Sequence, residues 1–178
     1  MNKIFFTLLF LIVAHTVFAQ QLSVTNAESK VSFVIKNMGI NVDGTLGGLK
    51  GRMQFDPKSL AATLFDITAD VNTINTNNAK RDAHLKKDDF FDAAQYPVIR
   101  MVINQVTAKG GNNYRGAGTL TIKNVTRKIS IDFVAIPNAT GYKFTSSFKI
   151  NRKDFGVGGS SMVMGDIVTV SLDVSAKK

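Results

Sequence analysis

The side chains best suited to acid–base chemistry gather in one charged segment, "RDAHLKKDDFFDAAQYP", at residues 81–97. His84 lies within it, two residues after Asp82, and a histidine beside a carboxylate can act as a general base. A hydrolase of this kind also needs a positioned nucleophile, and the sequence contains no Gly-x-Ser-x-Gly motif. The residues therefore favour a structural role for His84, and a lipid-modifying enzyme that uses His84 as its base is kept as an alternative.

Three carboxylates in the same segment, Asp88, Asp89 and Asp92, raise the question of a metal site. Metal sites in proteins normally combine several imidazole or thiolate ligands, or form a tight carboxylate cluster. The segment offers one imidazole, the chain has no cysteine, and capping of short helical turns accounts for these aspartates. We predict no metal and no cofactor, and the lack of cysteine also excludes disulfides and thiolate catalysis.

A glycine-rich stretch, "GVGGSSMVMG" at residues 156–165, resembles a dinucleotide-binding fingerprint. However, Ser161 stands where the last glycine of that fingerprint belongs, and no strand–turn–helix pattern surrounds it. We interpret the stretch as a loop at the mouth of a barrel.

Residues 1–19 have the features of a cleavable signal peptide. Lys3 precedes an apolar run at residues 4–14, and that run is shorter than the about 18 residues of a spanning helix. Cleavage after Ala19 would export the chain, and no cysteine follows to anchor a lipoprotein. We expect a periplasmic or secreted protein whose residues 20–178 form one domain.

The formal net charge is +9, and the basic residues are spread along the chain without a run of five or more. Such spacing favours a solvated surface over a nucleic-acid site. Binding of an anionic membrane or nucleic acid stays an alternative, and it would weaken steeply with salt.

Apolar and polar residues alternate along most of the chain, as they do in half-buried strands. In the run at residues 31–35, for example, Val31, Phe33 and Ile35 share one face. The further runs are at residues 40–46, 49–55, 65–71, 99–103, 120–122, 129–133, 144–150 and 168–174. About eight or nine strands with short turns predict an all-β fold, a single antiparallel sandwich or barrel.

The apparent strand length, near seven residues, is below the about 9–11 residues that cross a bilayer. It favours a water-soluble barrel with an apolar interior. A small barrel of this size is either filled by its own side chains or holds one ligand, and the pattern leaves both possibilities open.

Between residues 71 and 98 a short helical insertion interrupts the strands. Asn77 or Asn78 can cap a helix that begins near Ala79. Asp88 or Asp89 can cap a second turn, and Pro97 ends the segment because its ring disfavours a helical residue before it.

"RDAHLKKDDFFDAAQYPVIRM" resembles the signature of the YceI-like family of polyisoprenoid-binding proteins. "GTLTIKNVTRKISIDF" and "INRKDFGV" resemble later motifs of that family, in the same order, so that the likeness runs from about Gln21 to Ala176. Many relatives carry a histidine after the first strand, where this chain has Lys36 and Asn37, and a glycine in the hairpin turn, where it has Asn124.

The resemblance implies a lipocalin-like, extended antiparallel β-barrel of about eight strands that holds a long isoprenoid or similar amphiphile. It also implies a periplasmic or secreted location and a possible homodimer. We expect the protein to be a non-catalytic carrier, with no nucleic-acid partner and no membrane span. The residues expected to line the tunnel are Phe33, Phe55, Phe65, Ile67, Met101, Ile131, Phe133 and Phe148. The residues expected at the lid are Leu85, Phe90 and Phe91, with Arg81 and His84 near a polar headgroup.

Overall fold

The computed structural model describes residues 21–178, so the predicted signal peptide lies outside the described residues. The strands are β1 (Gln21–Val24), β2 (Lys30–Asn37), β3 (Ile40–Gln54), β4 (Leu64–Asn75), β5 (Val98–Gly110), β6 (Asn113–Ile122), β7 (Val125–Asn138), β8 (Gly141–Asn151) and β9 (Met164–Lys177). The helix α1 (Ala79–Leu85) lies between β4 and β5. Short 3-10 turns occupy Asn26–Glu28, Leu60–Ala62 and Arg152–Phe155.

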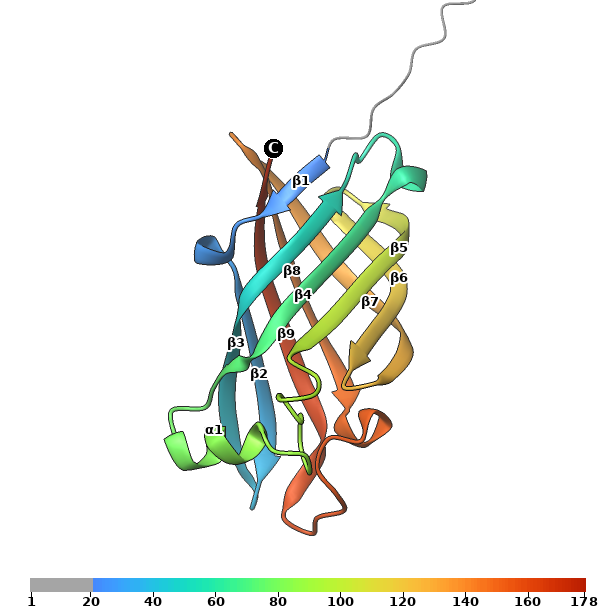
Figure 1. Cartoon of the computed structure of the whole chain (residues 1–178). Coiled ribbons are helices and arrows are strands. Elements are labelled where there is room, and N and C mark those ends of the chain that lie inside the picture. Colours follow the sequence, from blue (N-terminus) through green and yellow to red (C-terminus); the bar gives the residue numbers. More distant parts are fainter. Residues whose placement is uncertain (1–20) are drawn as a thin grey trace, which may run out of the picture.

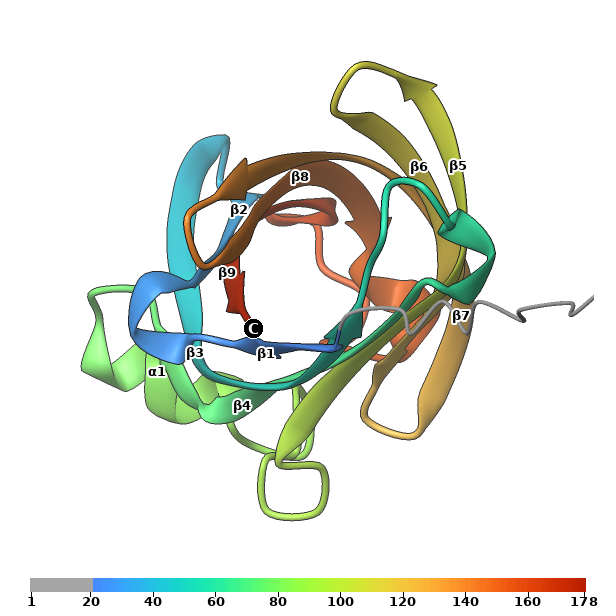
Figure 2. The same cartoon turned by 90° about the horizontal axis from the view of Figure 1, so that it is seen from above.

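The strands β2 to β9 close into an antiparallel barrel (Figures 1 and 2). Around the barrel their order is β3, β2, β9, β8, β7, β6, β5 and β4, and the pairing of β4 with β3 closes the circle. β1 pairs with β3 and β9 beyond the end of β2, so that β1 and β2 together form one interrupted strand position. The all-β barrel with a short helical insertion is therefore confirmed for the described residues.

The strands of this barrel are longer than the alternation indicated. β2 to β9 span 8 to 15 residues, which corrects the expected length of about seven. The difference is clearest in β3, where two apparent runs are one strand whose register shifts around Gly47. Such irregularities interrupt the period of two without ending the strand, so strand length cannot decide which face turns outward.

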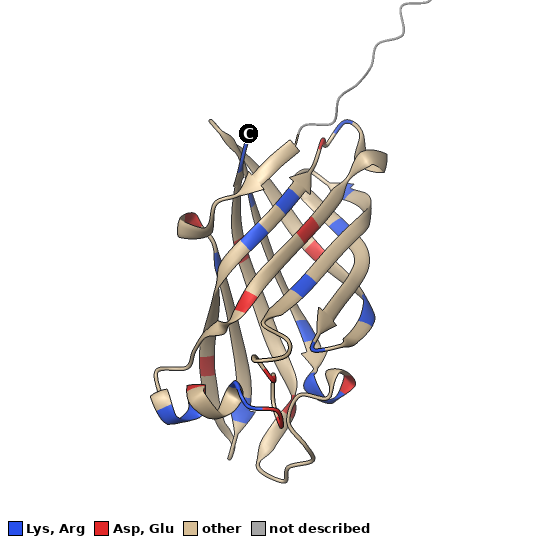
Figure 3. Cartoon of the chain, in the orientation of Figure 1, with Lys and Arg blue, Asp and Glu red and all other residues tan. Residues whose placement is uncertain are grey.

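The outer face is settled by its charges instead. Arg100 pairs with Asp66 at 2.7 Å between Nη2 and Oδ2, and Arg115 pairs with Asp132 at 2.7 Å between Nε and Oδ1. These side chains are exposed, whereas their strand neighbours such as Phe65, Ile67 and Phe133 are apolar and buried. Figure 3 marks the charged residues, which are spread over the strands of the barrel. Within residues 21–178, no helix has the length and apolar character that a bilayer span requires.

The helical insertion begins as its sequence predicts. Of the two candidate caps it is Asn78 whose side chain accepts a hydrogen bond from the Arg81 N–H, at 3.0 Å. Hydrogen-bonded turns follow up to residue 96, and β5 starts directly after Pro97. In the β6–β7 hairpin it is Lys123, not Asn124, that has a positive φ, 55°.

One half of the barrel interior is filled by an aromatic cluster, which consists of Phe55, Phe65, Tyr114, Phe133, Tyr142 and Phe144. Phe55 is at its centre, 1% exposed, with ring centroids 5.2 to 6.3 Å from those of the other five members. Leu22 of β1 and Met53 of β3 pack at the same end and are fully buried. We call this region the closed half; it lies toward β1 in Figure 1.

Candidate ligand-binding cavity

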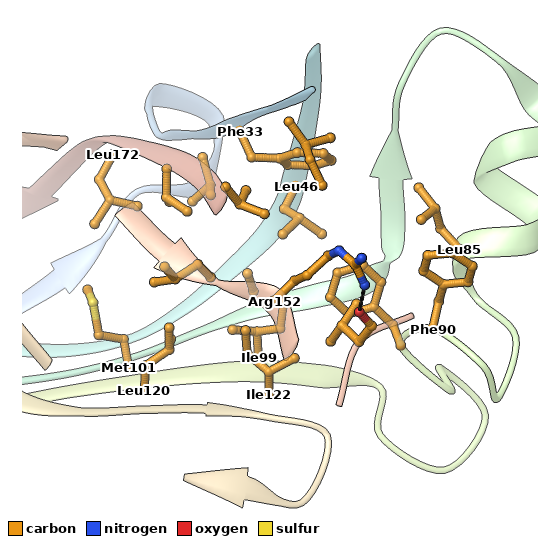
Figure 4. Close-up of a pocket in the computed structure, with 18 of the residues that line it drawn as sticks. Phe33, Leu46, Leu85, Phe90, Ile99, Met101, Leu120, Ile122, Arg152 and Leu172 are labelled. Carbon is orange, nitrogen blue, oxygen red and sulfur yellow. Dashed lines mark hydrogen bonds between the residues drawn. The ribbon is translucent and has the colours of Figure 1, made fainter. Parts of the chain in front are cut away.

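The other half of the barrel, toward α1, contains a cavity of about 190 Å³ (Figure 4). We call this region the hollow half. Its wall is made by inward-facing side chains of β2, β3, β4, β5, β6, β8 and β9 and by the two loops at the barrel end. The aliphatic part of the wall comprises Val31, Ile35, Val42, Leu46, Leu49, Ile67, Ala69, Ile99, Leu120, Ile122, Ile150, Val168, Val170, Leu172 and Val174.

In β4 the change from the filled to the hollow half coincides with a decrease in side-chain size. In β4 the successive inward residues are Phe65 in the aromatic cluster, then Ile67 and Ala69 at the cavity. Each step toward the mouth therefore shortens the side chain that reaches the barrel axis. Since interiors pack closely wherever side chains allow it, the shorter residues leave the free volume at this end.

Phe33 is a large side chain that lines the cavity without filling it. Its Cα partner across the β2–β3 pair is Gly44, and its ring lies flat against this glycine. A Cβ atom at position 44 would come within 2.2 Å of Cζ of the Phe33 ring. The glycine thus gives the ring a place along the wall, and the barrel axis beside it stays open.

Two loops meet at the mouth of the cavity, residues 86–97 and residues 156–165. The Gly158 N–H donates to the Asp89 carbonyl at 2.9 Å, and Gly158 has a positive φ, 64°. A side chain at Gly158 would come within 2.8 Å of the Phe90 ring, so the loops are in close contact there. This confirms that the glycine-rich stretch is a loop at the barrel mouth.

Arg152 holds this arrangement together from inside the barrel end and is 3% exposed. Its Nη1 donates to the carbonyls of Val157 and Gly158, and its Nε donates to Gly165, all at 2.8 to 2.9 Å. Its Nη2 lies 3.0 Å from Asp166 Oδ1. A buried charge of this kind is tolerated because it is paired and hydrogen-bonded. Arg152 fixes the shape of the mouth, and its donors are already engaged by the protein.

Sequence reasoning did not select Arg152 as a site residue. The only signal was its position in "INRKDFGV", where a cation stands directly after a strand and before the glycine-rich loop.

Four of the eight residues predicted to line the tunnel do line the cavity: Phe33, Ile67, Met101 and Phe148. The other four, Phe55, Phe65, Ile131 and Phe133, do not, and the prediction for them is corrected. They face inward as expected, but they pack in the closed half. Alternation identifies the face of a residue and carries no information about its depth along the barrel axis.

At the mouth, the predicted lid residues Leu85, Phe90 and Phe91 border the cavity, and so does Arg81. Nε and Nη2 of Arg81 donate to the side chain and the carbonyl of Thr76, each at 2.7 Å.

His84 is different from its neighbours, because it does not border the cavity. Its side chain is 56% exposed, Nε2 is 2.9 Å from Asp89 Oδ2, and its ring is in a T-shaped contact with the Phe90 ring, with 4.9 Å between the ring centroids. The structure thus brings Arg81 but not His84 to the cavity, and the expected contact of His84 with a headgroup stays a prediction. Within residues 21–178, no three His, Asp or Glu side chains gather closely enough to hold a metal ion.

Comparison with known proteins gives relatives over almost the whole described chain. Protein YceI of Escherichia coli O17:K52:H18 is 31% identical over 134 residues, which cover 71% of this chain and 70% of that protein. The crystal structure of BcnA from Burkholderia cenocepacia is 26% identical and superposes with a TM-score of 0.82, covering 87% of this chain and 99% of BcnA.

A polyisoprenoid binding domain from Saccharophagus degradans, implicated in plant cell wall breakdown, shares the fold at 17% identity. Its TM-score is 0.70, and the match covers 88% of this chain and 97% of that domain. The model of the YceI-like domain matches residues 22–176, from β1 to the end of β9. The chain belongs to the YceI-like domain family.

Proposed function

We propose that the protein is a non-catalytic carrier that holds a long-chain isoprenoid or a similar amphiphilic lipid in the hollow half of its barrel. The observation that carries the proposal is an apolar cavity that is open toward α1 and ends at the packed aromatic cluster. Such a cavity takes a chain from one end only, so the lipid tail lies inside and its polar headgroup stays at the mouth. The Saccharophagus domain, which has the same fold and is named for polyisoprenoid binding, supports this choice of ligand.

Burial of the tail alone can supply the binding free energy. Each buried CH₂ group contributes about 0.8 kcal/mol, so a five-carbon isoprene unit contributes a few kcal/mol. Several units exceed the about 4–15 kcal/mol that association costs in lost freedom. Because one methylene changes such binding little, the wall should select for an extended apolar chain rather than for one lipid.

The side chains at the mouth suit a headgroup position. Arg81 borders the cavity with its guanidinium group next to the buried Thr76, and it is the cation that we assign to the headgroup. The proposal gives His84 no contact with the ligand. We further propose that residues 1–19 direct the carrier to the periplasm or the cell exterior; the homodimer suggested by the family resemblance stays a prediction.

Native mass spectrometry of the purified protein, followed by solvent extraction, tests the proposal directly. We expect a mass excess that extraction releases as a lipid. Met101→Glu places a carboxylate in the cavity wall and should abolish this excess, since a charge in an apolar interior is strongly unfavourable.

Val102→Glu is the matched control, because Val102 is the next residue of β5 and its side chain points to the opposite face. Met101→Leu, which keeps the wall apolar, should retain the lipid and shows that position 101 tolerates substitution. Equal lipid retention in Met101→Glu and Val102→Glu would contradict binding inside the barrel.

The alternative function, a lipid-modifying enzyme, depends on His84. In the carrier, His84→Ala should leave lipid retention unchanged, because the imidazole lies outside the cavity. If the purified protein turns over the extracted lipid and His84→Ala loses this activity, the carrier function is contradicted and the enzyme is supported.

A further inference from the structure

Exposed apolar side chains gather at the open end of the barrel. Met162 is fully exposed, Met38 and Ile40 are 74% and 71% exposed, and Val163 is 54% exposed. They belong to two segments, the β2–β3 turn at residues 37–42 and the loop at residues 156–165, which we call the apolar tip. The tip is one unit, since the Met38 N–H donates to the Val163 carbonyl at 2.7 Å.

The apolar tip carries no charged residue in either segment. Figure 3 shows both segments in tan at the end of the molecule, beyond the positions coloured as charged residues. The cation nearest to the tip, Arg152, is buried and bonded to carbonyls of the loop. Two surface cations stand behind the tip: Gly165 lies against Lys36, and Lys153 pairs with Asp166 at 2.8 Å. Protein surfaces that enter the interface of a bilayer have this distribution of residues: apolar side chains reach the acyl chains, and cations set back from them meet the headgroups.

The tip is continuous with the cavity wall. Asn37, Val42, Val157 and Met164 belong to the tip and also line the cavity. A lipid chain that leaves the cavity on this side therefore passes along the inner face of the tip. The opposite side of the mouth, at residues 79–97, is rich in charged side chains, so only one side of the mouth has this apolar character.

We propose that the apolar tip docks into the surface of a lipid bilayer and opens the cavity toward the hydrocarbon, so that the carrier loads and unloads its ligand there. This inference rests on the proposed function. A second copy of the chain is a less suitable occupant, because two molecules with a strongly positive net charge repel, whereas anionic headgroups attract the same charge. The bilayer is also the phase in which the proposed ligand dissolves.

The chain contains no tryptophan, so a single introduced indole reports its own surroundings. Met162→Trp places it at the tip, and Ile136→Trp places it at an exposed apolar position of the closed half, where Ile136 is 48% exposed. With vesicles of phosphatidylcholine and phosphatidylglycerol, we expect a blue shift of the emission and quenching by brominated acyl chains for Met162→Trp only. Equal responses of the two variants, or none, would overturn the proposal.

Aspartate substitutions measure the contribution of the tip. The double variant Ile40→Asp, Met162→Asp replaces two apolar side chains that would be buried in the bilayer. It should therefore lower the constant for partitioning of the protein into vesicles by about tenfold or more. Ile136→Asp makes the same kind of change in the closed half and should alter it by less than about twofold. A concentration-dependent blue shift of Met162→Trp without vesicles would assign the tip to a second copy and contradict docking.

Native mass spectrometry of the same preparations separates the two proposals. Retained lipid without insertion of position 162 would overturn docking and leave the carrier function standing. Insertion of position 162 in a protein that neither retains nor takes up lipid would overturn the carrier function and support the tip as a membrane surface.

Discussion

The closed half and the hollow half are built by the same strands and the same hydrogen-bonding ladder. They differ in whether the inward side chains fill the space around the barrel axis. In the closed half, five aromatic rings meet around Phe55. In the hollow half, most of the wall is made of aliphatic side chains, and the Phe33 ring lies along the wall beside Gly44. A barrel of this size can therefore have both a packed core and a ligand-sized cavity, because the two lie at different depths along the barrel axis.

The largest contrast should come from removing one ring in each half. Phe55→Ala leaves a void inside the aromatic cluster and should lower the free energy of unfolding by about 3–5 kcal/mol. Phe33→Ala enlarges a cavity that already exists and should cost under about 2 kcal/mol. Denaturant titration of the lipid-free protein measures both, and similar losses would show that the hollow half is packed as tightly as the closed half.

Adding volume should give the next largest difference. Ala135, 2% exposed, packs in the core near Phe144, so Ala135→Leu should overpack it and cost about 1–3 kcal/mol. Ala69 borders the cavity, and Ala69→Leu should change stability by less than about 1 kcal/mol while it reduces lipid retention. Denaturation together with native mass spectrometry checks the pair, and a stable Ala135→Leu variant would contradict the division.

Gly44→Ala should act on the cavity with little effect on the fold. The added methyl group displaces the Phe33 ring, which has free space beside it, so the stability change should stay within about 1 kcal/mol. The displaced ring then occupies the volume of a lipid chain, and the amount of bound lipid should fall. Gly159→Ala is the control, because a Cβ atom there meets no atom within 4 Å.

The smallest effect on stability should come from a change on the outer surface, which lies outside both the aromatic cluster and the cavity. Arg115 and Lys109 hold the pKa of Asp132 well below its usual value. A carboxyl whose pKa is lower in the folded state stabilises the fold above its unfolded pKa, about 3.9, and loses that contribution as the pH falls further.

When the pH is lowered from neutral to about 3, the free energy of unfolding of Asp132→Asn should therefore fall slightly less than that of the unchanged protein. The difference should be small because solvent screens this exposed ion pair. Lipid retention at neutral pH should not change. A large change in retention would mean that this outer ion pair influences the cavity.

Residue pattern alone predicted the fold well because a barrel is specified by local rules. Alternation placed the inward faces of the strands, Asn78 and Pro97 marked the ends of the helical insertion, and the glycine-rich stretch at residues 156–165 was identified as a loop at the mouth. The strand lengths were underestimated, since a bulged strand such as β3 loses its period at Gly47 while its pairing continues.

Depth and side-chain direction could not be predicted in this way. Phe33 and Phe133 each follow a polar residue and precede a valine, so the alternation treats them alike. However, Phe33 lines the cavity and Phe133 packs in the closed half. Their difference depends on how strands are staggered around the barrel, which involves residues far apart in the chain. The same applies to Arg152, whose acceptors lie in the loop that follows and become close only when the loop folds back.

The aromatic cluster also has a kinetic consequence. A chain that enters at the mouth cannot thread through the barrel, so it must depart by the route along which it arrived. One guest has to vacate before the next can be admitted, and replacement should proceed at a rate independent of how much competitor is supplied.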